Sequence, residues 1–155
     1  MANPKQPSKK EFLYLDDLHV GQRFISGTHL IDEEQIKAFA KQFDPQPFHL
    51  DAEAAKDTLF EGLVASGWHT AAISMRLIVE GFPIAGGIVG VGGEIAWPKP
   101  TRPVATLHVE SEILELRPSR SRPDRGMVTI RSKTVNQLGE IVQVLTAKLV
   151  VPRRQ

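Results

Sequence analysis

The chain has 155 residues, 41% of them hydrophobic, which fits one domain that can bury its own core. The 19 Lys and Arg residues against 18 Asp and Glu give a formal charge of +1, which excludes the strong cationic field that nucleic-acid binding demands. The sequence contains no cysteine, so disulfide frameworks, thiolate nucleophiles and cysteine-type zinc sites are excluded.

The first ten residues are polar and carry several lysines and two prolines. We expect a flexible N-terminal segment over residues 1–10 and a single domain over residues 11–155. No apolar segment follows the lysines, so no secretory signal is expected. The longest apolar stretch, around residues 77–79, is too short to span a bilayer. We therefore expect a soluble cytoplasmic protein without a membrane partner.

The first predicted helix begins at Asp32, a favourable N-cap with Gln35 three residues later. Pro45 and Pro47 end it, because neither ring can continue a helix. A short helical piece is expected over residues 51–56. One face of the first helix carries apolar residues at helical spacing, namely Ile36, Phe39, Ala40 and Phe43.

A second, longer helix is predicted over residues 67–80, with Ser66 as its N-cap. Gly81 and Pro83 end it in the expected order. Its apolar residues cover most of the circumference, so we expect it to be buried on nearly all sides. These residues are Trp68, Ala71, Ala72, Ile73, Met75, Leu77, Ile78 and Val79.

Beyond residue 84 the sequence becomes rich in Val, Ile and Thr, with turns that contain Pro, Gly and Asn. Residues 136–139 predict a hairpin between the last two strands. A strand, helices and then four strands predict an α+β fold in which an antiparallel sheet covers one long helix. A curved sheet wrapped around one buried helix is the hotdog fold. Strands are expected over residues 22–30, 88–97, 104–116, 127–135 and 140–151.

Asp44 and His49 are the first candidate site. On a continuous helix they would point about 140° apart, but the two intervening prolines exclude that helix. We expect Asp44 at a helix end and His49 in an irregular loop, so that both side chains can turn toward one point. A carboxylate beside an imidazole can move protons near neutral pH. Asp and His are also ordinary turn residues, so spacing alone leaves a purely structural role open.

Gly67 is the second candidate. It is expected at the first turn of the long helix, where backbone N–H groups have no intrahelical partner and the helix dipole is positive. Such an N–H could polarise a thioester carbonyl and stabilise the enolate formed from it. The alternative is that Gly67 only permits close packing of the helix. His69, on the same helix, is expected to be a core histidine with satisfied hydrogen bonds.

Together these residues resemble the motif of the MaoC-like and R-specific enoyl-CoA hydratase family, roughly Asp-x-Asn-Pro-x-His with a glycine eighteen residues after the His. Asp44, Pro47, His49 and Gly67 match, whereas Gln46 replaces the usual Asn and Phe43 the usual Gly. The resemblance extends over nearly the whole chain from about residue 12. Further matching segments are residues 15–21 and 97–100.

The resemblance implies a hydro-lyase that adds water to an enoyl thioester or removes it from a 3-hydroxyacyl thioester. Asp44 and His49 would hold the water, and the Gly67 N–H would bind the thioester oxygen. The substrate would be an acyl group on coenzyme A or acyl-carrier protein, and no cofactor is implied. The hotdog family pairs subunits through their sheets, so a homodimer or higher homo-oligomer is expected.

Two other functions stay open. One is a hotdog acyl-CoA thioesterase, which usually places its carboxylate in the long helix; here that helix has only Glu80, at its far end. The other is a non-catalytic acyl-thioester-binding subunit. No metal site is expected, because the five histidines lack the spacing of metal ligands. Residues 86–93 contain glycine pairs but lead into a strand, so they predict no dinucleotide-binding loop. They predict either a strand bent over the central helix or a strand that a ligand approaches closely.

Overall fold

The computed structural model describes residues 11–155, so the expected N-terminal segment 1–10 lies outside the described residues, and the division of the chain at residue 10 stays a prediction. Within the described part, one six-stranded antiparallel sheet has the order β1-β4-β5-β6-β3, with β2 also paired to β4. The strands are β1 (Arg23–Ile25), β2 (His29–Ile31), β3 (Val89–Ala96), β4 (Ala105–Pro118), β5 (Arg125–Val135) and β6 (Ile141–Pro152).

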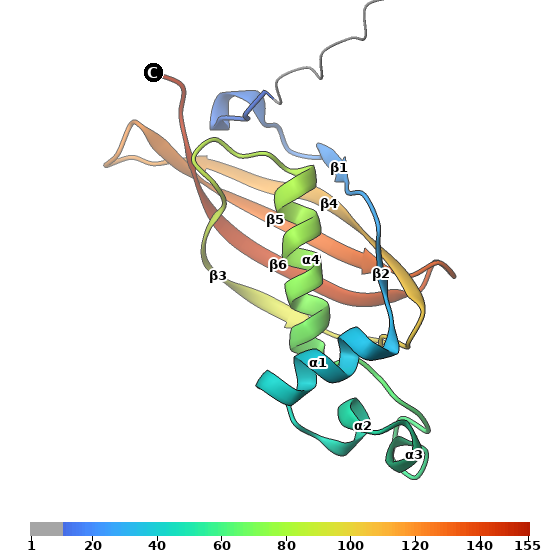
Figure 1. Ribbon diagram of the computed structural model, residues 1–155. Coiled ribbons are helices and arrows are strands. Elements are labelled where there is room, and N and C mark those ends of the chain that lie inside the picture. The colour runs from blue at the N-terminus through green and yellow to red at the C-terminus, as the bar shows by residue number, and fades with distance from the viewer. Residues whose placement is uncertain (1–10) are drawn as a thin grey trace, which may run out of the picture.

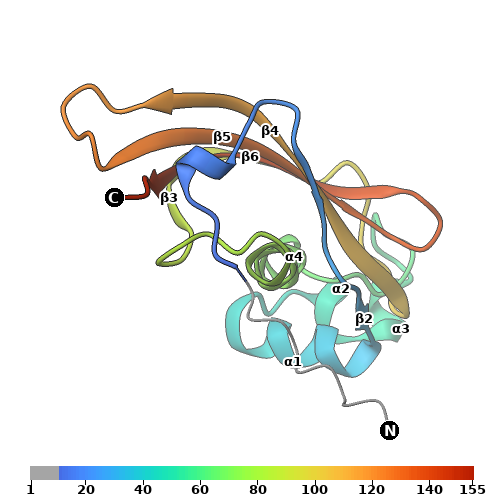
Figure 2. The same ribbon diagram turned by 90° about the horizontal axis from the view of Figure 1, so that it is seen from above.

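The long helix α4 (Gly67–Gly81) lies in the concave face of this sheet, where Figure 2 shows it end-on. The remaining α-helices gather at its N-terminal end (Figure 1). They are α1 (Glu33–Phe43), α2 (Pro47–Leu50) and α3 (Ala52–Ala55); a short 3-10 helix, η1 (Leu15–Asp17), precedes β1. The α+β hotdog architecture is confirmed. No helix within residues 11–155 is both long and apolar enough to cross a membrane.

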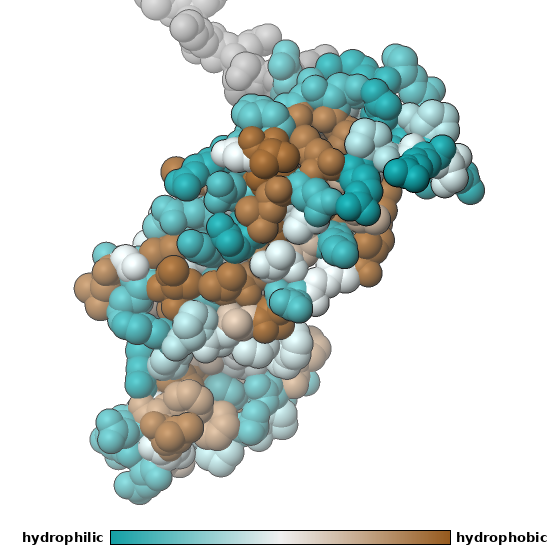
Figure 3. Space-filling model, turned by 180° about the vertical axis from the view of Figure 1, so that it is seen from behind, coloured by the Kyte–Doolittle hydropathy of each residue, from teal (hydrophilic) through white to brown (hydrophobic). Residues whose placement is uncertain are grey.

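The core lies between the inner face of the sheet and α4. Residues alternate along each strand, so one set points inward while the other faces solvent. The outer set is mixed, and the sheet seen from behind shows hydrophilic and hydrophobic side chains side by side (Figure 3). The inner set and the buried stripe of α4 together form the main apolar cluster, which includes Ile73, Leu77, Ile78, Val109, Ile113, Val128, Ile130 and Leu149.

Two expectations about these elements were wrong. The strand expected over residues 22–30 is two short strands, β1 and β2, that pair with different parts of β4. The helix α4 is not buried on nearly all sides: Trp68 is 60% exposed, Met75 42% and Val79 51%. The sheet covers only one side of α4, and apolar content alone does not report which side of a helix a neighbour covers.

The glycine-rich segment does form a strand, as predicted. β3 pairs with β6, and the register shifts between Gly90 and Gly92, which is the irregularity of a bent strand. Gly93 permits a close approach, because a Cβ there would lie 2.5 Å from the carbonyl oxygen of Thr146. β3 forms an edge of the sheet and leads directly into the segment that borders the candidate site.

Candidate active site

Asp44 and His49 are positioned by the end of α1 and the short helix α2. The Asp32 side chain accepts the Gln35 N–H at the start of α1, and Asp44 is the C-cap at its end. His49 lies in α2 rather than in the irregular loop that we expected. The reason is Pro47, which occupies the first position of α2, where the missing N–H is not needed for an intrahelical hydrogen bond.

The two side chains meet with Asp44 Oδ2 3.3 Å from His49 Nε2. The other ring nitrogen, Nδ1, lies 2.7 Å from the carbonyl oxygen of Val64. A carbonyl oxygen can only accept, so Nδ1 carries a hydrogen and donates it. In neutral His49 the Nε2 atom is therefore an acceptor. His49 Nε2 and Asp44 Oδ2 are then two neighbouring hydrogen-bond acceptors, one on a buried imidazole and the other on a largely buried carboxylate.

Two further donors hold the Asp44 carboxylate. The Ser66 hydroxyl donates to Oδ2 at 2.6 Å, and the Gln46 side-chain amide donates to Oδ1 at 2.6 Å. Partial burial acts to raise the pKa of Asp44, but these hydrogen bonds and the proximity of the His49 ring outweigh it, so the pKa lies below its ordinary value. Asp44 is therefore a carboxylate at neutral pH. Gln46, which replaces the usual Asn, contributes to this arrangement.

Ser66 has a second role beyond the N-cap that the sequence predicted. Its Oγ accepts the Trp68 N–H at 3.3 Å and so caps α4, while its hydroxyl hydrogen is donated to Asp44. One side chain thus joins the start of α4 to the end of α1. The cap was predicted from the sequence, but the second contact was not, because twenty-two residues separate Ser66 from Asp44.

Gly67 is the first residue of α4, as predicted, so its N–H has no intrahelical acceptor. A Cβ at this position would lie 2.7 to 2.9 Å from three ring atoms of Trp97. The glycine therefore permits close packing, the alternative noted above, and the contact is with the Trp97 indole. The contact with Trp97 involves the Cα atom of Gly67 and not its N–H. Binding of a thioester oxygen by that N–H therefore stays a prediction.

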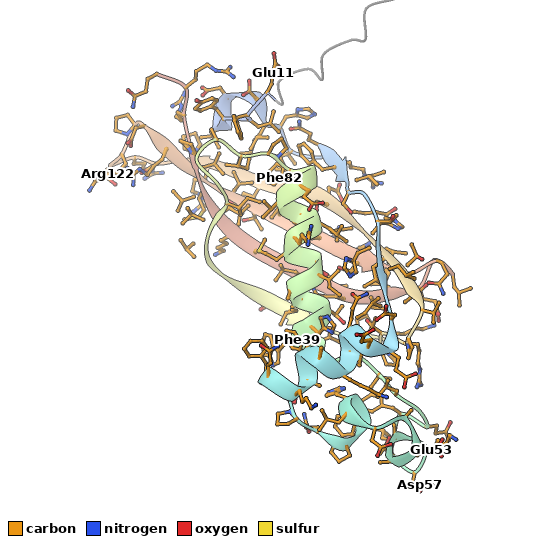
Figure 4. The ribbon with its side chains drawn as sticks, in the orientation of Figure 1. Glu11, Phe39, Glu53, Asp57, Phe82 and Arg122 are labelled. Atoms are coloured by element: carbon orange, nitrogen blue, oxygen red, sulfur yellow. The ribbon has the colours of Figure 1, made fainter. Side chains whose placement is uncertain are left out.

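A cavity of about 390 Å³ adjoins these groups. His49 and Gly67 both line it, whereas Asp44 does not and is connected to it by its contact with His49. The other lining residues are Phe48, Phe60, Val64, Ala65, Thr70, Trp97, Pro98, Lys99, Pro100, Thr101 and Val142. A larger hollow lies elsewhere, beside the β4–β5 turn. Figure 4 shows Arg122, in that turn, far from Phe39 of α1, which lies beside the N-terminal end of α4.

His69 differs from our expectation. It is buried, but its Nδ1 has no hydrogen-bond partner within residues 11–155. Its ring stacks on Phe39 with the ring centres 4.5 Å apart and the planes 3° from parallel. Burial, together with the nearby His29 and His49, lowers the pKa of His69 to about 4. The residue therefore stays neutral at physiological pH.

No group of three or more His, Cys, Asp or Glu side chains in the described part of the chain is arranged to hold a metal ion. The absence of a metal or a cofactor from the reaction stays a prediction. What the geometry provides is an ionised carboxylate, an imidazole of fixed tautomer and a helix N-terminus beside a cavity. These groups suit proton transfer and the stabilisation of an oxyanion.

The sequence model of the MaoC like domain matches residues 17–136, most of the chain. The chain belongs to the MaoC-like domain family. A MaoC-like dehydratase from Rhodospirillum rubrum has a similar structure, with 60% identity, a TM-score of 0.91 and coverage of 92% of this chain and 99% of that one. For the R-hydratase PhaJ1 from Pseudomonas aeruginosa the identity is 29%, the TM-score 0.73 and the coverage 91% and 86%.

An uncharacterized protein of Bacillus subtilis, YdeM, is 36% identical over 125 residues, which cover 79% of this chain and 87% of that protein. The MaoC-like family includes hydratases and dehydratases, so membership supports this class of chemistry at the level of the family. The resemblance predicted from Asp44, His49 and Gly67 is thereby confirmed, whereas the roles of these three residues stay predictions.

Proposed function

We propose that the protein is an acyl-thioester hydratase or dehydratase that adds water across the C2–C3 bond of an enoyl thioester, or removes it in reverse. The observation that carries the proposal is the convergence of Asp44 Oδ2 and His49 Nε2 at 3.3 Å beside a cavity that Gly67 also lines. A water molecule can donate one hydrogen to each of these two acceptors. Its oxygen lone pair is then free to attack C3.

The reaction begins as the water oxygen bonds to C3 and its proton passes to the Asp44–His49 pair. Electrons of the C2–C3 double bond move toward the thioester carbonyl, whose oxygen accepts the Gly67 N–H and gains negative charge. The pair then delivers a proton to C2, and the carbonyl is restored. The two groups are coupled by direct contact, so the proton belongs to the pair. Each step is reversed in dehydration.

The acyl group is carried on coenzyme A or acyl-carrier protein, and no resident cofactor takes part. We also propose a homodimer. β3 forms an edge of the sheet, and apolar side chains are exposed on it and on the neighbouring face of α4. Pairing two β3 edges would satisfy their backbone groups and cover these side chains. They are Trp68, Met75, Val79, Val89 and Val91. Light scattering coupled to size exclusion should give twice the mass of the chain.

The test is the loss of the conjugated-thioester absorbance of crotonyl-CoA. Asp44→Asn and His49→Ala should each lower kcat/KM by ~10²–10⁴-fold, because each removes one of the groups that move the proton. Matched controls are Asp57→Asn and His19→Ala, both exposed and outside the cavity lining, which should keep wild-type rates. Figure 4 shows Asp57 at the tip beyond α3.

Three results would redirect the proposal. If wild type hydrates crotonyl-CoA and both site variants do so at the same rate, Asp44 and His49 take no part in the mechanism. Release of free thiol without hydration would indicate a thioesterase. Tight binding of acyl-CoA without turnover, unchanged by Asp44→Asn, would indicate a binding subunit.

A further inference from the structure

Two buried threonines line the cavity beside the candidate site. Thr70 lies in the first turn of α4 and is 1% exposed, and Thr101 follows the proline-rich segment after β3 and is 3% exposed. The Thr70 hydroxyl donates to the Thr101 hydroxyl at 3.0 Å. The Ala65 N–H donates to the Thr101 carbonyl oxygen at 2.9 Å, which fixes this part of the backbone beside the cavity.

The hydroxyl hydrogen of Thr101 is not used in this pair. A hydroxyl has one hydrogen to donate, and Thr101 is the acceptor in its contact with Thr70. Among residues 11–155 no acceptor receives the Thr101 hydrogen. Leaving a buried donor unpaired costs free energy, so the hydrogen of a buried hydroxyl on a cavity wall is available to a molecule that enters the cavity.

Thr101 lies where the arm of a substrate has to pass. Residues 98–100, directly before it, are exposed and line the mouth of the cavity. Gly67 and Thr70 are three residues apart on α4, which is about 4.5 Å along the helix axis. In an acyl group carried on pantetheine, two methylene groups separate the thioester sulfur from the first amide, a span of similar length. A thioester carbonyl at Gly67 therefore brings this amide near Thr101.

The cavity wall around Thr101 suits a neutral acceptor. Val64 and Val142, which also line the cavity, are buried and apolar. Lys99 is the only Lys or Arg of the described lining, and it lies at the mouth in an ion pair with Glu140. Burying an anion among apolar side chains without a cation is costly, whereas an amide carbonyl needs only a hydrogen-bond donor.

We propose that the Thr101 hydroxyl donates a hydrogen bond to the pantetheine amide carbonyl nearest the thioester sulfur, and so holds the arm while the thioester carbonyl lies at Gly67. The inference rests on the proposed function, because it takes the cavity as the place where an acyl thioester binds. The same amide is present in coenzyme A and in acyl-carrier protein, so this subsite serves either carrier.

Thr101→Val removes the hydroxyl and keeps the shape of the side chain. The Thr70 hydroxyl then still has the Ser66 carbonyl oxygen as an acceptor, 3.5 Å away. Thr134→Val is the matched control, because the Thr134 hydroxyl is also buried and paired, with Ser74, but lies outside the cavity lining. Ser74 keeps the Thr70 carbonyl oxygen as its acceptor at 2.7 Å. Thr101→Ser retains the donor.

Calorimetry with butyryl-CoA, which lacks the double bond, measures binding without turnover. Thr101→Val should raise the Kd of butyryl-CoA and of free coenzyme A by about three- to tenfold, the effect of losing one neutral hydrogen bond. Thr101→Ser and Thr134→Val should bind both as wild type does. A rise for butyryl-CoA alone would place the acceptor on the acyl thioester and overturn the proposal. An equal rise in both Val variants would also overturn it.

Two short crotonyl thioesters locate the acceptor. Crotonyl-N-acetylcysteamine keeps the amide nearest the sulfur, whereas S-ethyl thiocrotonate has no amide. Wild type should hydrate the first with the larger kcat/KM. Thr101→Val should lower the ratio of the two values by about three- to tenfold, because only the first compound loses a hydrogen bond. An unchanged ratio would overturn the proposal.

These results separate the two proposals. Hydration of crotonyl-CoA with unchanged binding in Thr101→Val overturns the role of Thr101 and leaves the proposed function standing. Absence of hydration together with the expected loss of affinity overturns the proposed function and supports the subsite. Absence of both binding and hydration overturns both proposals.

Discussion

The two ends of α4 are built from different kinds of contact. At the N-terminal end, Ser66, Asp44 and His49 form a hydrogen-bonded polar group around a cavity. At the C-terminal end, Phe82 is buried with its ring 4.6 Å from that of Phe24, and the surroundings are apolar. Figure 4 labels Phe39 at the first end and Phe82 at the second.

This difference separates the candidate site, at one end of the helix, from the apolar packing that stabilises the helix at the other end. Apolar contacts gain free energy from burial, so the C-terminal end holds the helix in the sheet. Buried polar groups gain little net stability even when they are fully hydrogen-bonded. The N-terminal end contains such groups, together with the Nδ1 atom of His69, which is buried and has no hydrogen-bond partner among residues 11–155. We therefore expect substitutions at the two ends to change different measurable quantities.

The largest expected effect is at the C-terminal end. Phe82→Ala should lower the free energy of unfolding by about 3–5 kcal/mol, because it leaves a cavity at a side chain that is 1% exposed. Denaturant unfolding measures it, with kcat/KM of the folded fraction expected to stay near wild type. The matched control, Phe12→Ala at a 59% exposed position, should cost less than about 1 kcal/mol. If Phe12→Ala and Phe82→Ala lose similar amounts of unfolding free energy, the apolar packing at the C-terminal end of α4 is not what stabilises the helix.

His69 gives the N-terminal end a pH-dependent stability. Its folded pKa of about 4 lies below its ordinary value of 6.5. The free energy of unfolding that depends on neutral His69 is therefore fully present above pH 6.5, and it is lost as the pH falls from 6.5 toward 4. This difference in pKa corresponds to about 3 kcal/mol of the free energy of unfolding. Solvent screening reduces the expected loss of stability to about 2 kcal/mol.

Denaturant unfolding at several pH values between 7 and 4 measures this loss. His69→Phe, which keeps a ring to stack on Phe39, should flatten this part of the pH dependence. His19→Gln, at an exposed position, should leave it as in wild type. An equal slope in wild type and His69→Phe would show that His69 is not the group that titrates.

The sequence predicted the elements of both ends but not the contacts between them. Local rules sufficed for Asp32 and Ser66 as N-caps and for the prolines that end α1. They failed for α2, where Pro47 starts a helix instead of excluding one. The composition of α4 also led to the wrong prediction that it is buried on nearly all sides, because composition reports which side chains are apolar but not which of them a neighbouring element covers.

The candidate site shows the same limit. Asp44, His49 and Gly67 could be selected from spacing and resemblance, and the structure places His49 and Gly67 on one cavity. The contacts of Trp97 with Gly67 and Gln143 join residues thirty or more positions apart. The bond from Ser66 to Asp44 also depends on how α1 packs against α4. Long-range packing decides such contacts, and no local pattern encodes them.

Ser66 provides the smallest and most specific test of the comparison. Ser66→Ala removes the hydroxyl that donates to Asp44 and also the N-cap of α4, so it should cost about 1 kcal/mol of stability. The lost hydrogen bond stabilises the ionised carboxylate, so the pKa of Asp44 should rise. The proposed mechanism needs that carboxylate ionised, so the acid limb of kcat/KM should move to higher pH.

Asp32→Ala is the matched control for this variant. It removes the N-cap of α1 at a similar cost in stability, and Asp32 does not contact Asp44. The pH profile of kcat/KM should keep the wild-type acid limb in Asp32→Ala and move in Ser66→Ala. If both profiles move together, the effect of Ser66 is only that of a cap. If the Ser66→Ala profile alone moves, this hydroxyl positions and ionises Asp44, and the N-terminal end of α4 takes part in the chemistry through its cap.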